Sequence, residues 1–317
     1  MKKVVIFGGG TGLSQLLKGL KEFPVDVTAI VTVADNGRST GKLRNEFNIP
    51  AVGDITKVLL SMSNVDDDIK DLMNYRFEKG TELETHSIKN LIMTSLLEMK
   101  GDFKHSIPIM ARILNIKGNV LPITEENVNL VGITKKGDEI VGEEELTHDR
   151  RKIVRVKYNK KISLSPEIKK AISNADLIVF SSGSLLTSVV PNLLVDGICD
   201  EINKAKAKTM YVCNLVTQPG ETDNFKVSDH TKFIQNYLGP NSIDAVIAND
   251  AKMSNYIVKK YASLEQKDPV KIDENNLKKL NVEVIKDKTW KIEDNYLRHD
   301  ALKTAYLIFS YLMDEEG

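Results

Sequence analysis

The stretch Val4-Val5-Ile6-Phe7-Gly8-Gly9-Gly10-Thr11-Gly12 decides the fold of this 317-residue chain. Its first four residues form an apolar, mostly β-branched run that is too short for a helix and is typical of a buried parallel strand. A second strand is expected over residues 27–33. Between them, apolar residues at three- and four-residue spacings up to Pro24 predict an amphipathic helix: Leu13, Leu16, Leu17, Leu20 and Phe23. A strand, a helix and a strand in this order form a right-handed unit with parallel strands, so the sequence predicts an α/β fold.

The same pattern returns toward the C-terminus. Apolar runs at 176–181, 209–214 and 243–249 each end in small polar residues and predict further strands. Helical spacing marks residues 54–62, 68–77, 87–99, 166–174 and 300–313, with Asp54 and Asp300 as expected N-caps. Residues 119–158 instead hold short strand-like pieces and charged turns. We therefore expect one domain over residues 1–317 that includes a β-rich insertion at about 119–158.

The composition excludes several classes of protein. The 44 Lys and Arg balance the 44 Asp and Glu, so the chain lacks the basic field of nucleic-acid-binding proteins. No stretch reaches the roughly 18 apolar residues that cross a bilayer, and we expect no membrane insertion. Cys199 and Cys213 are too few for a disulfide framework or a thiolate metal cluster. These features predict a cytoplasmic protein.

The loop Gly9, Gly10, Thr11 and Gly12 lies between the first strand and the first helix. Free backbone N–H groups and the positive end of the helix dipole favour a phosphate at such a place. The loop is not the dinucleotide fingerprint, because the third glycine would have to stand at Leu13, and this argues against an NAD-dependent oxidoreductase. It also lacks the Walker lysine. The alternative is a tight turn that lets strand and helix pack closely.

The loop after the second strand carries Asp35, Asn36 and Ser39, at the edge of the sheet where α/β folds bind ligands. The Asp35 carboxylate could bind a ribose hydroxyl, hold a hydrated Mg²⁺ ion or orient an attacking alcohol, and Asn36 and Ser39 could form neutral hydrogen bonds. Asp35-Asn36-Gly37 is also ordinary turn chemistry, so a purely structural loop is the alternative.

Three further segments are candidates for the same edge. Ser87 and Asn90 share one helix face next to His86, and no second His or Cys stands at ligand spacing, so zinc is not expected. The stretch Ser181-Ser182-Gly183-Ser184 could form a second anion site, which with the glycine loop would suit a diphosphate, or a serine-rich turn. The segment from Asn214 to Asp223 could frame a base or a sugar, or form a type II turn at Pro219-Gly220.

Six motifs in fixed order carry a family resemblance: GGGTGLS at Gly8, TVADNGRSTGKLR at Thr32, VGDI at Val52, HSIKN at His86, ADLIVFSSGSLLTSVVPNLL at Ala175 and NLVTQPGETDN at Asn214. Together they resemble the YvcK-like gluconeogenesis factor family (UPF0052), which is related to the CofD-like 2-phospho-L-lactate transferases. Those transferases move a phospholactyl group from a guanylyl donor onto a deazaflavin precursor with Mg²⁺. The resemblance spans the chain from Lys2 to Leu297-Arg298-His299-Asp300.

This resemblance implies a three-layer Rossmann-like parallel sheet flanked by helices. It also implies a cytoplasmic protein needed for cell shape on gluconeogenic carbon sources. The expected ligands are UDP-sugars or other nucleotide diphosphates, and a homo-oligomer is compatible with the resemblance. Arg298 would contact a phosphate or the uracil, because its planar guanidinium pairs with phosphate oxygens. The matching motifs place these residues in the ligand cleft: Gly9, Gly10, Thr11, Gly12, Asp35, Asn36, Ser39, His86, Asn90, Gly183, Ser184, Asn214 and Arg298.

The chain departs from the family motifs at several positions. Arg38 replaces the second glycine of D-[DN]-G-G-S-[ST]-G, and Ser182 stands where G-P-G-S has proline. Thr85 and Lys89 replace the two glycines of G-H-S-x-G-N, and Thr56 replaces the arginine of P-G-D-[IV]-R. The two extra cations, Arg38 and Lys89, could bind phosphate in place of the lost arginine or point into solvent.

Two classes of function follow. The first is a non-catalytic regulatory protein that binds a nucleotide sugar, with phosphates on the glycine and Ser184 loops, sugar or ribose near Asp35, and Arg298 closing the site. The alternative is a Mg-dependent transferase of the 2-phospho-L-lactate type, in which Asp35 would hold Mg²⁺. His86 or Asp54 would then assist an attacking hydroxyl as general base. Beyond that Mg²⁺, no cofactor or metal is expected.

Overall fold

The computed structural model describes residues 1–149 and 151–314. Their central element is a seven-stranded sheet with the order β10-β9-β8-β7-β1-β2-β3, in which every pairing is parallel. The predicted α/β fold with a parallel sheet is confirmed. Its strands are β1 (Lys2–Gly8), β2 (Val25–Val31), β3 (Asn119–Pro122), β7 (Leu177–Phe180), β8 (Lys208–Val212), β9 (Ala245–Asn249) and β10 (Glu283–Asp287).

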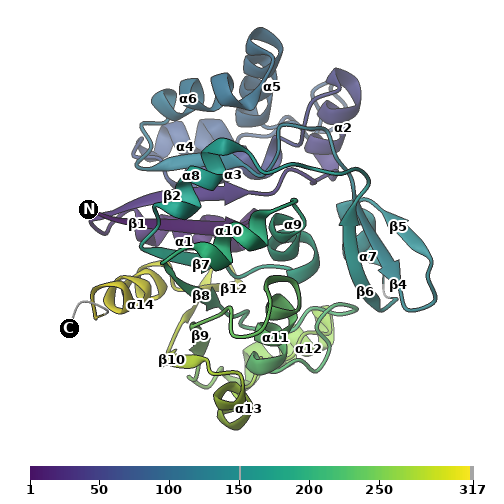
Figure 1. Cartoon of the computed structure of the whole chain (residues 1–317). Coiled ribbons are helices and arrows are strands. Elements are labelled where there is room, and N and C mark those ends of the chain that lie inside the picture. The colour runs from purple at the N-terminus through teal and green to yellow at the C-terminus, as the bar shows by residue number, and fades with distance from the viewer. Residues whose placement is uncertain (150, 315–317) are drawn as a thin grey trace.

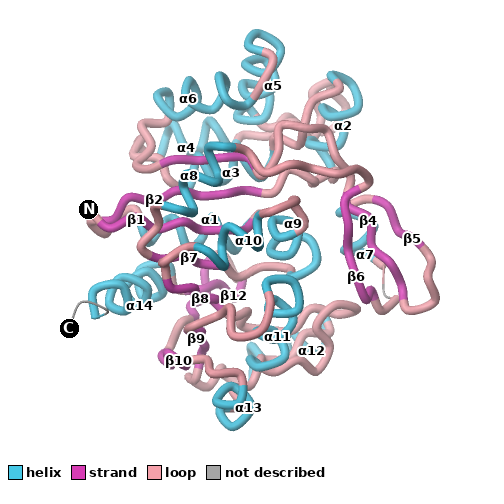
Figure 2. Tube along the Cα trace, viewed as in Figure 1, coloured by secondary structure: helices cyan, strands magenta, loops and turns pink. Residues whose placement is uncertain are grey.

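Helices cover both faces of this sheet and make the fold three-layered (Figures 1 and 2). From β1 the strand order runs one way to β2 and β3, and from β7 the other way to β10. Right-handed crossovers therefore place the helices of the two halves on opposite faces. One face carries α1 (Gly10–Leu20), α3 (Gly53–Ser61) and α14 (Ala301–Asp314), which pack on one another. The other carries α8 (Pro166–Ser173), a π-helix (Leu185–Val189), α9 (Val190–Leu193), α10 (Ile198–Lys204) and α11 (Val227–Leu238).

A small antiparallel sheet stands apart, at the right of Figure 1, beyond the carboxyl end of β1. It consists of β4 (Leu130–Thr134), β5 (Glu139–Val141) and β6 (Ile153–Tyr158), and it carries the short helix α7 (Glu143–His148). This is the predicted β-rich insertion, with one correction to its start. Residues 119–122 belong to the main sheet, because β3 pairs with β2.

The remaining elements include several that the sequence analysis did not predict. Helices α2 (Arg38–Phe47), α4 (Asp67–Asn74), α5 (Ile88–Lys100) and α6 (Phe103–Ile113) lie beside the β3 edge of the sheet (Figure 1). The others are α12 (Asn255–Glu265), α13 (Glu274–Lys279) and the hairpin of β11 (Trp290–Glu293) and β12 (Tyr296–His299). Of the two predicted caps, Asp300 is confirmed, since its Oδ1 accepts the Lys303 N–H at 3.1 Å.

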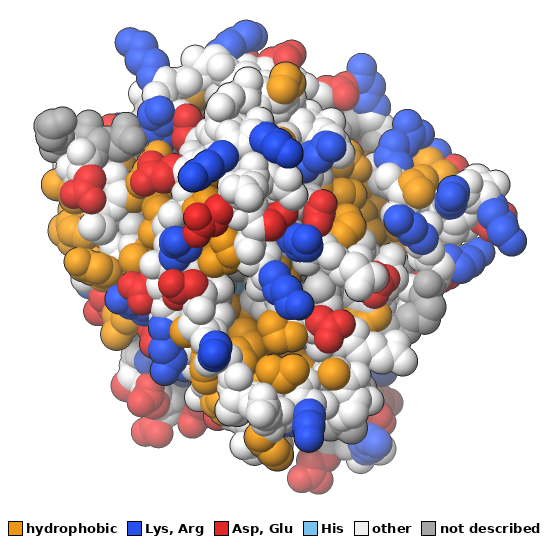
Figure 3. Space-filling model, turned by 90° about the horizontal axis from the view of Figure 1, so that it is seen from below, with side chains coloured by type: hydrophobic (Ala, Val, Ile, Leu, Met, Phe, Trp, Pro, Cys, Tyr) orange, Lys and Arg blue, Asp and Glu red, His pale blue; other side chains and the backbone are white. Residues whose placement is uncertain are grey.

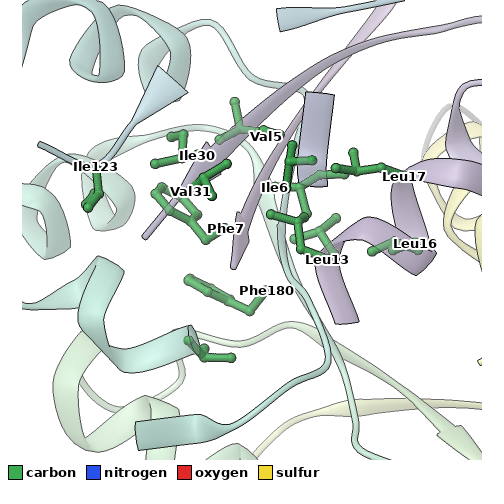
Figure 4. Packing of buried hydrophobic residues seen from close by; sticks show 14 of the residues in the cluster. Val5, Ile6, Phe7, Leu13, Leu16, Leu17, Ile30, Val31, Ile123 and Phe180 are labelled. Atoms are coloured by element: carbon green, nitrogen blue, oxygen red, sulfur yellow. The ribbon is translucent and has the colours of Figure 1, made fainter. Parts of the chain in front are cut away.

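The core is built around the stretch that decides the fold. Figure 4 shows β1, β2 and α1 contributing apolar side chains to one cluster, and Leu13 and Leu17 are 0 and 1% exposed. On the neighbouring strands β1 and β7, the rings of Phe7 and Phe180 stack with centroids 5.6 Å apart. Each such side chain adds about 1.5–3 kcal/mol on burial, so this packing fixes the position of the glycine loop that joins β1 to α1.

The surface agrees with the balanced composition. In Figure 3, Lys and Arg are interspersed with Asp and Glu over the face that is seen. Among the described residues, no helix is long and apolar enough to span a membrane.

Candidate functional site

Two adjoining cavities lie at the carboxyl ends of the central strands, where the sequence analysis expected a ligand. The first, here called the Asp35 cavity, has a volume of about 380 Å³ and extends from Asp35 to Lys89 and α7. The second, the Arg298 cavity, has about 200 Å³ and lies between Thr11, Gly183 and Arg298. They meet at the glycine loop, because Lys57 of the first cavity donates a hydrogen bond to the Thr11 Oγ1 of the second at 2.7 Å.

The glycine loop is packed too tightly for a side chain at Gly9 and at Gly12. A Cβ on Gly9 would lie 2.5 Å from the Thr32 Oγ1, and one on Gly12 would lie 1.9 Å from the Ser182 carbonyl oxygen. The tight-turn interpretation therefore holds, and it is compatible with anion binding, because Thr11 and Gly12 in the first turn of α1 line the Arg298 cavity.

Asp54 does not cap α3, contrary to the sequence-based expectation. The cap position is Val52, and the Asp54 carboxylate points away to accept the backbone N–H of Gly10. Its Oδ2 also accepts a long hydrogen bond, 3.4 Å, from the Thr32 hydroxyl. Asp54 thus stabilises the glycine loop through Gly10 and also lines the Asp35 cavity.

One wall of the Asp35 cavity is acidic. It brings together Asp35, Asp54 of α3 and Glu143 of α7. Burial and repulsion from Asp35 raise the pKa of Asp54 to about 6. Burial and repulsion from Asp35 and Asp54 raise the pKa of Glu143 to about 7. These carboxyl groups can therefore exchange protons near neutral pH or accept hydrogen bonds from hydroxyl groups.

The small sheet is tied to the loop that holds Asp35. The Asn36 Oδ1 accepts the Glu144 N–H at 2.8 Å, and the Asn36 Nδ2 donates to Glu145 at 2.8 Å. Asp35 itself accepts the Gly37 N–H at 2.9 Å, as in the expected turn. Asn36 therefore uses its amide to hold α7 over the cavity, and the insertion forms part of the cavity wall.

Three predicted ligand residues form a hydrogen-bonded network. The Ser39 Oγ lies 3.0 Å from the His86 Nδ1 and accepts the Asn90 Nδ2 at 3.2 Å, while the Asn90 Oδ1 accepts the Thr56 hydroxyl at 2.7 Å. Ser39 and Asn90 line the Asp35 cavity, and His86 is 6% exposed and lies behind Ser39. Burial lowers the pKa of His86, so it positions Ser39 as a neutral imidazole.

The lining of the same cavity also has a basic part, here called the basic wall, which carries Arg38, Lys57, Arg76 and Lys89. Arg38 is exposed, with φ of 42°, whereas Lys89 is only 8% exposed and bonds the Asn74 Oδ1. Of the two extra cations in the motifs, Lys89 is thus the one held inside the cavity.

The Arg298 cavity is shaped by the loop after β7. Both amide atoms of Asn214 bond to the backbone of Gly183, whose N–H donates at 2.8 Å and whose carbonyl accepts at 2.7 Å. Gly220 has φ of 80° and the Glu221 N–H bonds the Gln218 carbonyl at 3.1 Å, so the expected type II turn is present. The Arg298 guanidinium lies 5.0 Å from the Tyr296 ring centroid, which orients it at the cavity.

The second predicted anion site already holds a carboxylate of this chain. Glu221 accepts the Ser184 hydroxyl at 2.7 Å and the backbone N–H groups of Leu185 and Leu186. Of these donors, the Ser184 hydroxyl belongs to the stretch that the sequence analysis proposed as an anion site. Of the two anion sites that the sequence analysis predicted, the glycine loop is therefore the one whose backbone N–H groups are open to a ligand, while Ser184 borders the cavity.

We expect Glu221→Gln to remove a pH dependence of stability. Burial raises the pKa of Glu221 from an ordinary value of 4.5 to about 7. The folded chain then binds more protons than the unfolded chain between these values, and the free energy of unfolding falls as pH rises through that window. Relative to the variant, the wild-type chain should lose up to about 3 kcal/mol from pH 4.5 to pH 8. Urea unfolding at both pH values measures this difference, with Glu98→Gln at an exposed position as control. Parallel pH profiles for wild type and Glu221→Gln would contradict the assignment.

The acidic wall also bears on metal binding. Among the described residues, no group of three His, Cys, Asp or Glu side chains is placed to hold a metal ion. Mg²⁺ commonly needs only one or two carboxylates together with ligand phosphates and water. Asp35 and Asp54 satisfy that requirement beside the glycine loop, so a Mg²⁺ ion fits here only as part of a complex with a phosphorylated ligand.

Comparison with known proteins places this geometry in a family. Residues 4–290 match the family described as "2-phospho-L-lactate transferase CofD". The chain is 42% identical over 313 residues to a protein named "Gluconeogenesis factor" of Bacillus subtilis, covering 98% of each chain. It is 43% identical to the protein of the same name from Halalkalibacterium halodurans, covering 97% of this chain and 95% of that one. A crystal structure of a UPF0052 family member from Bacillus halodurans superposes with a TM-score of 0.93 at 42% identity, over 97% of this chain and 99% of that one. The chain therefore belongs to the CofD family, in the UPF0052 group whose curated members are named gluconeogenesis factors.

Proposed function

We propose that this protein is a nucleotide-sugar-binding regulator of the gluconeogenesis factor type, with a UDP-sugar as its ligand, and that it acts in the cytoplasm in maintaining cell shape on gluconeogenic carbon sources. One observation carries the proposal. Two cavities, one with a stacked arginine and one with a carboxylate wall, meet at a glycine loop that opens a helix N-terminus.

The three parts of a nucleotide sugar match the three parts of this cleft. The base and ribose fit the Arg298 cavity, where the guanidinium and the Gln218 side chain provide polar partners. The diphosphate fits over Thr11 and Gly12, where the α1 dipole and Lys57 favour negative charge. The sugar hydroxyls fit against Asp35, since carboxylates accept hydrogen bonds from hydroxyl groups.

A binding role is supported by the state of the polar groups around the cleft. His86, Asn36 and Asn214, three of the predicted ligand residues, use their side chains to hold neighbouring parts of the protein. They pre-organise the cleft, which raises affinity by lowering the entropy lost on binding.

Arg298→Ala is expected to weaken UDP-sugar binding about 100-fold, since a hydrogen bond to a charged group contributes about 1.5–3 kcal/mol. Arg298→Lys should recover only part of this affinity, because an ammonium cannot make the paired contact. Calorimetric titration measures both variants, and Arg112→Ala on the exposed side of α6 is the matched control. Unchanged affinity in Arg298→Ala would exclude the Arg298 cavity as the nucleotide site.

The second candidate is a Mg-dependent transferase of the 2-phospho-L-lactate type, favoured by the acidic wall. Mg²⁺ would screen the phosphate charge when bound by Asp35 and Asp54. The general base would be Glu143, because its pKa of about 7 suits proton transfer near neutral pH and it is not needed for the metal. Mass spectrometry of a reaction with Mg²⁺, a guanylyl phospholactyl donor and a deazaflavin acceptor tests this. Product that forms with the wild-type protein and not with Glu143→Gln would support the transferase. If the wild-type protein forms no product, the transferase is excluded and the regulatory function stands.

A further inference from the structure

The basic wall of the Asp35 cavity contains more cations than the proposed nucleotide contacts, since that ligand involves only Lys57 among them. Lys57 comes from α3, Arg76 from the segment after α4, and Lys89 from the first turn of α5. Three separate elements thus bring cations to one cavity, close enough for Arg76 and Lys57 both to repel the Lys89 ammonium. We call Lys57, Arg76 and Lys89 the cation triad.

Within the described part of the chain, the triad has no carboxylate at ion-pair distance. None of the ion pairs between described residues includes one of its members. The Lys89 ammonium bonds the neutral amide of Asn74, and the Arg76 Nη1 donates to the Thr85 carbonyl at 2.5 Å. Lys89 is buried, Lys57 is half-buried and Arg76 is exposed at the mouth of the cavity. A charged group as enclosed as Lys89 is normally paired, since an unpaired one costs free energy.

The charged neighbours of Lys57 differ from those of Lys89. Asp35 and Asp54 act on Lys57, at the boundary between the two walls. The charged groups that act on Lys89 are both cations. Burial and repulsion from Arg76 and Lys57 lower the pKa of its ammonium to about 8. The N-terminus of the 13-residue helix α5 adds a positive potential at the same place, and its cap residue Ser87 makes no side-chain capping bond.

We infer that the cation triad is a second oxyanion site, which binds the phosphate group of a small phosphorylated molecule beside the nucleotide sugar. A guanidinium supplies a paired contact to two phosphate oxygens, and two ammonium groups supply point charges that balance a dianion. The Asn74 amide offers a neutral donor on the same wall. The site lets the regulator respond to two metabolites. It does not require the proposed nucleotide binding to be correct.

The test uses inorganic phosphate as the probe. Phosphate should raise the melting temperature of the wild-type chain in a saturable way, and the apparent affinity should fall at least about tenfold in Lys89→Gln and in Lys57→Gln. Lys232→Gln, at an exposed position of α11, removes the same charge and should behave as wild type. No saturable effect in wild type, or equal effects in all four proteins, would overturn the site.

A second readout separates an anion site from a structural lysine. Without phosphate, Lys89→Gln should melt at a higher temperature than wild type, because the substitution removes a buried ammonium that Arg76 and Lys57 repel. A lower melting temperature would mean that Lys89 is structural and would overturn the proposal.

The same titration on protein saturated with UDP-N-acetylglucosamine identifies the source of the phosphate. Undiminished phosphate binding supports a separate ligand, whereas competition would show that the triad holds the phosphates of the nucleotide itself and would overturn a second site. If the nucleotide does not bind at all, the proposed function fails while the phosphate result for the free protein still decides the inference.

Discussion

Replacing Arg44 by alanine is expected to lower the free energy of unfolding by about 3–5 kcal/mol, the largest effect on stability that we predict for a single side chain. Arg44 is 4% exposed. Its Nη2 donates to the Val128 carbonyl at 2.8 Å and to the side-chain oxygens of Asn127 and Asn129 at 2.6 and 3.0 Å. Its Nη1 donates to the Asp35 carbonyl at 3.2 Å. Alanine would leave these acceptors unpaired inside the protein, where each costs about 1–3 kcal/mol.

Urea unfolding followed by circular dichroism measures this loss. Arg112→Ala, which removes an exposed arginine from α6, should stay within about 0.5 kcal/mol of wild type. Because Arg44 joins the Asp35 loop to the chain that leads into β4, its loss should also weaken ligand binding at the Asp35 cavity. An Arg44→Ala protein as stable as Arg112→Ala would contradict the role given to these hydrogen bonds.

Gly12→Ala is expected both to destabilise the protein by about 3 kcal/mol and to abolish nucleotide-sugar binding. The new Cβ would lie 1.9 Å from the carbonyl oxygen of Ser182 and 2.6 Å from its carbonyl carbon. Both atoms belong to the backbone, so the clash cannot be relieved by rotating a side chain. The first turn of α1 must move away from the loop after β7, and the junction of the two cavities lies between them.

The control is Gly37→Ala in the neighbouring loop. There the nearest atom to a new Cβ is the Asp35 Oδ1 at 3.4 Å, an ordinary contact. Gly37 is also the N-cap of α2, so a loss of up to about 1 kcal/mol is expected from that change alone. Thermal unfolding and calorimetric titration of both variants compare the two positions. Equal losses would show that the close approach of Gly12 to Ser182 is unimportant.

The part of the fold that sequence predicts best is the part with local apolar runs. β1, β2, β7, β8 and β9 each contain such a run, because a strand covered by helices on both faces must be apolar on both sides. β10 has the sequence Glu-Val-Ile-Lys-Asp and lies at the edge of the sheet. Its polar ends leave an apolar run too short to predict a strand. α6 contains Pro108, which usually interrupts a helix, and α2 begins within a glycine-bearing loop.

The candidate site was predictable where loops follow strands. Asp35, Gly183, Asn214 and the glycine loop all lie at the carboxyl ends of strands, and any parallel sheet brings those ends together. Lys57, Arg76 and Glu143 could not be found in this way, because they come from helices and connections whose placement depends on long-range packing. Glu221 belongs to the motif NLVTQPGETDN that begins at Asn214, but its hydrogen bond with Ser184 could not be predicted from the sequence and is seen only in the folded chain.

We propose that this cleft binds a nucleotide sugar and leaves it chemically unchanged. The measurement that tests it most directly is calorimetric titration of the wild-type protein with UDP-N-acetylglucosamine, UDP-glucose, GDP and NAD, each with and without Mg²⁺, followed by mass spectrometry of the recovered ligand. We expect the UDP-sugars to bind without Mg²⁺ and to be recovered unchanged, and NAD not to bind. Binding of GDP alone, and only with Mg²⁺, or no binding by any UDP-sugar, would contradict the account.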